Sequence, residues 1–263
     1  MIYWEITSKC NLDCDYCLNK SYRSHTRELE TSDMLTIAEN LAKRYNSGVV
    51  ITGGEPMLRT DLPALVAHLR THGVKKIHLV TNGFSKPLDT VLDGLFDRIA
   101  YTVHLRNGER EPDFSPVIQG LTELSCVNSV EVNFLLSNHT KNSIAPLITD
   151  ITKKTAVRKF QLQRIIVKSN HLRDQALSDD AVKQFVEELK KIKTSQDIEI
   201  SVNDFTSADA KYYVVRSDGI LIAHTATSEK EIGSLLHLDK PIPSPLIPLF
   251  SKRQLYIQGT CKQ

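Results

Sequence analysis

The chain of 263 residues is 41% hydrophobic and 24% charged, a composition typical of a globular protein with a sizeable core. Its formal net charge of +2 gives no bulk electrostatic reason to expect nucleic acid or an anionic membrane as a partner. No apolar run approaches the roughly 20 residues that span a bilayer. The N-terminus lacks a basic segment followed by a long apolar one, so we expect a cytoplasmic protein.

Strands and helices alternate over the first two thirds of the chain. Segments rich in β-branched and aromatic residues predict strands at 2–7, 48–52, 76–81, 98–105, 129–136 and 159–167. Apolar residues at helical spacing predict helices at 31–45, 61–73, 87–96, 116–125 and 142–154. This repetition indicates an α/β fold whose parallel strands are joined by right-handed crossovers, either closing toward a barrel or lying open.

The last third of the chain has a different pattern. A helix is predicted at 178–193, followed by three segments, 197–205, 210–225 and 231–239, that we interpret as short antiparallel strands. Asp218 and Gly219 supply the turn of a hairpin. Residues 239–254 contain four prolines and are expected to be extended, without regular structure. The change of pattern divides the chain into a domain at 1–195 and an extension at 196–263.

Three cysteines, Cys10, Cys14 and Cys17, directly follow the first predicted strand. They therefore lie at the carboxyl end of that strand, where barrel enzymes build their sites. Three close thiolates can bind one soft metal ion or one iron-sulfur cluster. A structural zinc site would need a fourth ligand nearby, and the nearest histidine is His25. A four-iron cluster held by three thiolates would instead keep one iron open for a small molecule.

The sequence around these cysteines, "CNLDCDYC", resembles the Cys-x3-Cys-x-aromatic-Cys pattern of the radical S-adenosylmethionine enzymes. "ITGGEP" at 51–56 is similar to that family's Gly-Gly-Glu-Pro motif, and "VTNG" at 80–83 closes the third strand as in many members. The resemblance implies a partial (β/α)6 barrel with a small C-terminal β-hairpin extension. It also implies two cofactors, a [4Fe-4S] cluster and S-adenosylmethionine.

By this resemblance, Cys10, Cys14 and Cys17 ligate the cluster, and the open iron binds the amino and carboxylate groups of S-adenosylmethionine. Tyr16 matches the aromatic position that lies near adenine, although a core aromatic beneath the loop is an equal alternative. The resemblance assigns the methionine end of the cofactor to the second motif, Gly53, Gly54, Glu55 and Pro56. There the glycines would allow close backbone approach.

Further cofactor-binding candidates lie at the ends of later strands: Thr81, Asn82, His104, Asn133 and Arg164. Thr102 and His104 end the strand where the family often holds the ribose hydroxyls, but a strand histidine is also commonly a satisfied core or rim residue. A buried arginine needs an anion. For Arg164 that anion is either a cofactor or substrate carboxylate or, structurally, Glu131.

The segment at residues 214–237 resembles the twitch or SPASM extension of one subgroup, but Ala223 and His224 stand where that subgroup has a cysteine. The remaining cysteines, Cys126 and Cys261, are too few for a second cluster. We therefore expect one cluster, and an extension that acts as a lid over the substrate.

The resemblance predicts an enzyme that reductively cleaves S-adenosylmethionine and abstracts a hydrogen atom, followed by epimerisation, rearrangement or bond formation. The predicted substrate is a peptide or natural-product precursor; a nucleotide or sugar is the alternative, and a non-catalytic iron-sulfur or zinc-binding interaction protein is the alternative of another class. A reducing partner such as flavodoxin or ferredoxin is expected, with no membrane partner. No aromatic-rich basic module accompanies the basic run at 153–168, so nucleic acid is not expected to bind.

Overall fold

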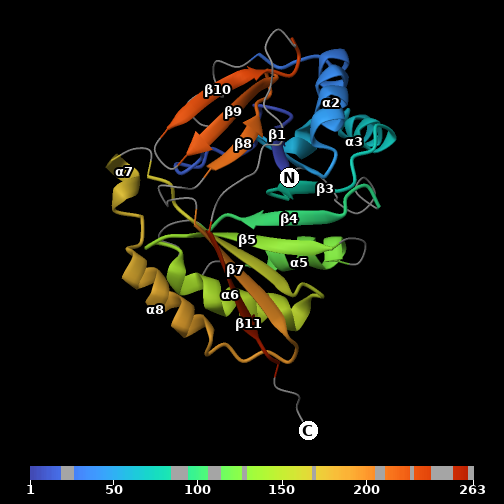
Figure 1. The fold of residues 1–263 in the computed structure, drawn as a ribbon. Helices are drawn as coiled ribbons and strands as arrows, with labels where there is room; N and C mark the ends of the chain where they lie inside the picture. The colour runs from blue at the N-terminus through green and yellow to red at the C-terminus, as the bar shows by residue number, and fades with distance from the viewer. Residues whose placement is uncertain are drawn as a thin grey trace.

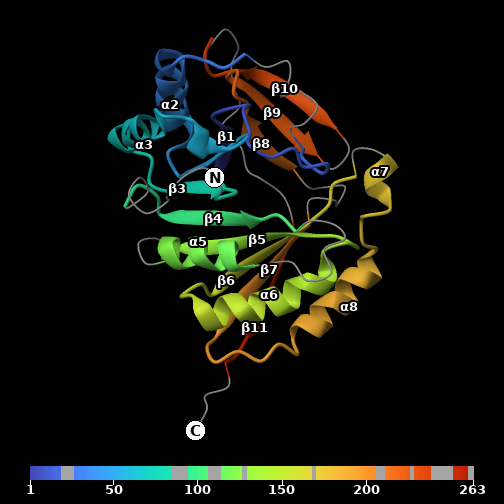
Figure 2. The ribbon, with the colours of Figure 1, turned by 180° about the vertical axis from the view of Figure 1, so that it is seen from behind.

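The computed structural model is shown in Figures 1 and 2. It describes residues 1–18, 27–83, 94–105, 114–125, 129–167, 170–204, 211–225, 228–237 and 251–259. The helix expected at 87–96 and both remaining cysteines, Cys126 and Cys261, fall mainly or wholly outside these residues.

One sheet of 11 strands, counted over the described residues, runs through the molecule in the order β10-β9-β8-β1-β2-β3-β4-β5-β6-β7-β11. The strands are β1 (Ile2–Glu5), β2 (Val49–Thr52), β3 (Ile77–Thr81), β4 (Arg98–Val103), β5 (Val130–Leu136), β6 (Lys159–Arg164), β7 (Ile198–Asp204), β8 (Lys211–Val215), β9 (Ile220–Thr225), β10 (Glu229–Ser234) and β11 (Ser251–Ile257). From β8 to β7 in this order each strand is parallel to its neighbour, and the outer strands are antiparallel. The order does not close on itself, which confirms the predicted partial barrel.

Helices connect the parallel strands and pack beside them. They are α2 (Thr31–Tyr45), η1 (Pro56–Leu58), α3 (Leu62–Thr71), α5 (Ser115–Ser125), α6 (Lys141–Lys154), α7 (Asn170–Arg173) and α8 (Asp179–Leu189). In both views α2 and α3 lie side by side near β1 and β3, while α5, α6 and α8 lie near β4 to β7 (Figures 1 and 2). In the described part of the chain, no helix has the length and apolar character needed to cross a membrane.

Side chains along each strand point alternately to the two faces of the sheet, one packed against the helices and the other lining a cavity. One row of paired residues crosses six strands and is fully or almost fully buried: Val215, Trp4, Ile51, Leu79, Ile99 and Val130. Successive side chains on a strand point to opposite faces, so the residues between them point inward. The paired inward row Tyr3, Val50, His78 and Arg98 lines a cavity. The helices therefore cover one face, and the other carries the candidate site.

The antiparallel prediction for the last third of the chain is confirmed in part. β8, β9 and β10 form the expected antiparallel arrangement, with Gly219 in the turn at φ +82°. β7 is antiparallel to β11, but β7 is also parallel to β6 and β8 is also parallel to β1, and these two parallel pairings were not predicted. The division of domains at residue 195 stays a proposal.

The tail prediction was wrong at its end. Residues 251–254 belong to β11, which pairs with β7 over its whole length. The prolines that argued against regular structure stop at Pro248, before this strand begins. Residues 239–250 lie outside the described part of the chain.

Candidate active site

The three cysteines lie in the loop after β1, as the sequence predicts. Cys10, Cys14 and Cys17 are thiols rather than disulfides, and each is partly buried. The loop folds tightly, because the amide of Cys17 donates to the carbonyl of Cys14 at 3.1 Å and the amide of Leu12 lies 3.4 Å from Cys10 Sγ. Three thiols in one short loop are a donor set that suits an iron-sulfur cluster.

Gly53 and Gly54 hold the backbone that leads into this loop. The amide of Gly54 donates to Thr7 O and the amide of Glu55 donates to Lys9 O, both at 2.8 Å. A Cβ on Gly54 would lie 1.9 Å from Lys9 O, and Gly53 has φ +136°. The sequence interpretation was that these glycines allow the backbone to approach a ligand closely. The structure shows that their closest neighbour is the chain's own segment at 7–9.

Glu55 is buried and ties the ends of β2 and β3 together. Its carboxylate accepts hydrogen bonds from the amide of Met57 (3.0 Å), Thr81 Oγ1 (2.8 Å) and the amide of Asn82 (2.8 Å). Burial raises the pKa of Glu55, although the three hydrogen bonds act in the opposite direction. Asn82 Nδ2 donates to Asn11 Oδ1 at 2.8 Å, which extends the network into the cysteine loop.

Pro56 begins η1 and is buried. Thr81, Asn82 and Glu55 thus come together as the sequence predicts, but their contacts are with one another and with the cysteine loop. They position the loop, and whether they also contact a cofactor stays a proposal.

His104, just after β4, contacts the cysteine loop directly. Its Nδ1 lies 2.8 Å from Tyr16 Oη and 3.5 Å from Cys14 Sγ, and the rings of Tyr16 and His104 are stacked at an interplanar angle of 9°. Burial lowers the pKa of His104 to about 4, and burial is the first cause that raises the pKa of Tyr16. Both side chains are therefore neutral at neutral pH, and His104 is a polar wall of the site.

A second network, which the sequence analysis missed, braces the same loop from outside. Glu28 accepts hydrogen bonds from Thr7 Oγ1 (2.9 Å) and from the amide and hydroxyl of Ser8 (both 2.6 Å). Arg59 donates to Ile6 O at 3.1 Å and is paired with Asp61 through two hydrogen bonds of 2.8 and 2.6 Å. Charged residues in loops carry no periodic signal, so the pattern alone did not point to them.

A cavity of about 510 Å³ opens beside the cysteine loop on the inner face of the sheet. Cys17 and Tyr16 line one part of it, and the strands of the sheet supply most of the rest. Its polar lining residues include Thr102, Asn133, Gln161, Gln163, Asn203, Tyr212 and His224. The sequence analysis named Thr102 and Asn133 but missed the others. Gln161 and Gln163 recur at alternate strand positions, a signal in the sequence that could have identified them.

Two buried acceptors in this lining have no hydrogen-bond partner among the described residues. They are Oδ1 of Asn133, on β5, and Oδ1 of Asn203, on β7. Their side chains are almost fully buried, with 7% and 4% of their surface exposed. A buried polar atom without a partner is costly, so both positions suit a ligand that donates hydrogen bonds.

The arginines of the cavity are both paired with carboxylates. Arg164 binds Asp179 at 2.8 Å and donates to Leu177 O at 3.0 Å, so the suggested pairing with Glu131 was wrong. Glu131 pairs with Arg98 at 2.8 Å. The lining therefore offers neutral hydrogen-bonding groups, two arginines that are paired with carboxylates, and the buried carboxylate of Glu5.

Residues 4–120 match the Radical SAM superfamily. Among curated proteins, the chain is 30% identical over 160 residues to a "Probable GTP 3',8-cyclase" of Methanococcus maripaludis, covering 57% of this chain and 53% of that protein. It is 28% identical over 174 residues to a "GTP 3',8-cyclase" of Chlorobaculum tepidum, covering 60% of this chain and 52% of that protein. The chain thus spans about half the length of these relatives.

Solved structures share the fold at low sequence identity. The structure "Native anSMEcpe with bound AdoMet" is 15% identical with a TM-score of 0.65, covering 90% of this chain and 78% of that one. "Streptococcus suis SuiB bound to S-adenosylmethionine" is 14% identical with a TM-score of 0.62, covering 84% and 59%. The match over residues 4–120, which include the motif-bearing loop at the carboxyl end of β1, identifies this part of the chain as a Radical SAM superfamily domain.

Proposed function

We propose that the chain is a radical S-adenosylmethionine enzyme whose Cys10, Cys14 and Cys17 hold a single [4Fe-4S] cluster. The observation that carries this proposal is the loop of three thiols, which is held by hydrogen bonds to neighbouring segments and adjoins the cavity. When bound, the cluster would reduce S-adenosylmethionine at its open iron and so provide a 5'-deoxyadenosyl radical. A flavodoxin or ferredoxin is the proposed source of the electron.

The residues around the loop orient and enclose the cofactor. Tyr16 and His104 form a neutral polar wall beside Cys14, and Asn82 fixes the loop through Asn11. Asn133 offers a buried acceptor for a hydroxyl group of the cofactor or substrate. The walls of the cavity limit the access of water to whatever is bound within it.

For the substrate, we propose a nucleotide or sugar, which was the alternative in the sequence interpretation. The relatives named GTP 3',8-cyclase support this class better than a peptide precursor. The cavity of about 510 Å³ lies within the usual range for small-molecule sites, roughly 300–1,000 Å³. Its amide and hydroxyl lining suits a neutral, hydroxyl-rich group, because both lining arginines are already paired.

A peptide substrate is the second candidate. It is favoured by fold neighbours whose descriptions include a peptide, such as "Native anSMEcpe with bound AdoMet and Cp18Cys peptide", with a TM-score of 0.63. That likeness, at 15% identity, supports the fold and carries less weight for the substrate than the sequence relatives do.

A substrate panel tests this choice. The reconstituted, reduced protein is incubated anaerobically with S-adenosylmethionine and with nucleosides, nucleotides, nucleotide sugars or short peptides, and 5'-deoxyadenosine is measured. We expect a nucleotide or a sugar-containing compound to accelerate its release, and Asn203→Ala to weaken that acceleration. Acceleration by peptides alone would overturn the substrate class. If the protein carried a full complement of iron but released no 5'-deoxyadenosine in any incubation, a non-catalytic iron-sulfur protein would be favoured.

A further inference from the structure

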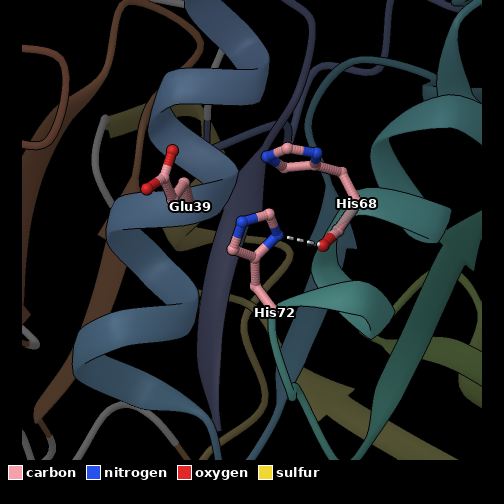
Figure 3. Close-up of side chains that lie close together, drawn as sticks. All are labelled: Glu39, His68 and His72. Atoms are coloured by element: carbon pink, nitrogen blue, oxygen red, sulfur yellow. Dashed lines mark hydrogen bonds between the residues drawn. The ribbon is translucent and has the colours of Figure 1, made fainter.

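A group of three metal-binding side chains lies between α2 and α3, on the outer side of the sheet from the cavity. His68 and His72 are four residues apart, so they stand on the same side of α3 and its C-terminal cap. Glu39 lies on the adjacent helix α2 (Figure 3). One ligand atom from each of the three residues lies within 4.8 Å of the other two.

The histidines are arranged as metal ligands commonly are. His72 Nδ1 lies 2.9 Å from the carbonyl oxygen of His68, which fixes this nitrogen as the protonated one and leaves Nε2 as an electron-pair donor. A backbone carbonyl on the other ring nitrogen is a frequent partner of metal-binding histidines. Both imidazole rings turn an edge toward α2 (Figure 3).

His68 supplies a second, independent observation. Its Nε2 atom is buried and has no hydrogen-bond partner among the described residues. The ring lies 4.2 Å from that of His72, measured between ring centroids. A buried imidazole nitrogen without a partner costs stability, and a metal ion would satisfy it.

Glu39 supplies the anionic group of the proposed site. The ion pair with Lys43 uses Oε1 of Glu39, at 2.6 Å, which leaves Oε2 for a metal.

From this geometry we propose that Glu39, His68 and His72 bind a divalent transition-metal ion, with Zn²⁺ the best match. Two neutral imidazoles and one carboxylate are a common ligand set for Zn²⁺, and a water molecule completes a tetrahedral site. The bound ion clips α2 to α3, which pack on each other beside β1 and β3. The proposal does not depend on the proposed enzymatic function, since no residue of the cysteine loop takes part.

Zinc titration of the cluster-loaded protein tests this site, because its cysteines are then occupied. We expect one Zn²⁺ per chain by anaerobic calorimetry and a higher melting temperature with Zn²⁺ present. His68→Ala and His72→Ala should each weaken binding at least about tenfold and abolish the thermal shift, a loss that even outer partners of a metal can cause. His139→Ala, which removes an exposed histidine elsewhere, is the matched control and should change neither.

A variant that binds Zn²⁺ more tightly is also needed, because weaker binding by a variant could result from misfolding. Lys43→Ala removes the cation that competes for Glu39 and should tighten Zn²⁺ binding about twofold, the size of an exposed ion pair on a helix. The Cys10, Cys14 and Cys17 triple-alanine variant should still bind one Zn²⁺. Equal affinity in the parent and both histidine variants, or no binding by the parent, would overturn the proposal.

Discussion

Gly54 lies where the loop after β2 meets the backbone that leads to Cys10. A Cβ there would overlap Lys9 O, and a backbone atom cannot move away as a flexible side chain can. We predict that Gly54→Ala destabilises the fold by about 1–3 kcal/mol, the usual cost of overpacking. We also predict that it impairs cluster assembly, because it displaces the segment at 7–9. Urea unfolding and iron content after reconstitution measure the two effects.

Gly120→Ala is the matched control for this substitution. Gly120 lies inside α5, and its added Cβ would meet Tyr101 only at an ordinary 3.6 Å. Alanine should therefore raise stability slightly, by about 0.5–1 kcal/mol, because glycine is unfavourable within helices. If Gly54→Ala assembled a full cluster with parental stability, the structural role of the glycine would be wrong.

His78 predicts a pH dependence of stability. Burial, and then the charge of Arg98, lower the pKa of His78 to about 4. The unfolded chain, with an ordinary pKa of about 6.5, takes up a proton that the folded chain does not. Stability should therefore fall as the pH decreases from about 6.5 to 4, by about 1 kcal/mol after allowing for the partial exposure of this side chain.

Denaturant unfolding of parent and His78→Gln at pH 7 and pH 5 measures this contribution. The variant should lose less stability than the parent on acidification, because glutamine does not titrate. An identical loss in both proteins would show that the proton uptake lies elsewhere.

Residue types were easier to predict from the sequence than their partners. Local sequence predicts the first three strands, so it also predicts which residues lie at their carboxyl ends: the cysteines, Glu55, Thr81 and Asn82. The partner of Arg164 is Asp179, which begins α8, and that contact depends on how a later helix packs. A sequence pattern carries no such information, so pairing with Glu131 was an error of tertiary structure.

At the scale of elements, Arg59 connects η1 and α3 to the cysteine loop. Its side chain is 10% exposed and its partners include Asp61, Glu28 and Ile6 O. We predict that Arg59→Met costs about 2–4 kcal/mol, because it leaves partly buried carboxylates without a cation. It should also weaken retention of the cluster, measured as iron remaining after desalting.

Lys183→Met provides the comparison for this ion-pair network. Lys183 and Asp180 form an exposed pair on α8, which should contribute less than about 1 kcal/mol. If Arg59→Met behaved like Lys183→Met in both stability and iron retention, the bracing role of Arg59 would be refuted.

The positions of strands were predicted well where the strands' own residues define them. The directions of the later strands were predicted only in part, because these depend on which strands pair. β1 to β6 lie within the predicted segments, and α2 has the predicted bounds. The direction of β7 and β8 depends on which strand they meet, and each meets a parallel neighbour at one side of the barrel. β11 was missed because nearby prolines outweighed its alternating residues, although it completes the sheet beside β7.

At the scale of the whole molecule, the curved sheet places the cysteine loop, a network of buried polar residues and a cavity on one inner face. The other face is covered by helices, two of which carry the proposed zinc ligands. Reconstituted protein should therefore bind close to four irons at the cysteine loop. Any further metal should bind at the proposed zinc site and should be absent from the His68→Ala variant. The matching triple-alanine variant of the loop should retain almost no iron.

The electron paramagnetic resonance spectrum of the reduced cluster, recorded with and without S-adenosylmethionine, tests the central claim most directly. It reports on the open iron itself and needs no knowledge of the substrate. We predict a clear change of the signal on addition of the cofactor, and no cluster signal in the Cys14→Ala variant. An unchanged spectrum, or a full cluster signal in that variant, would contradict the assignment of the loop as a cluster site with an open iron.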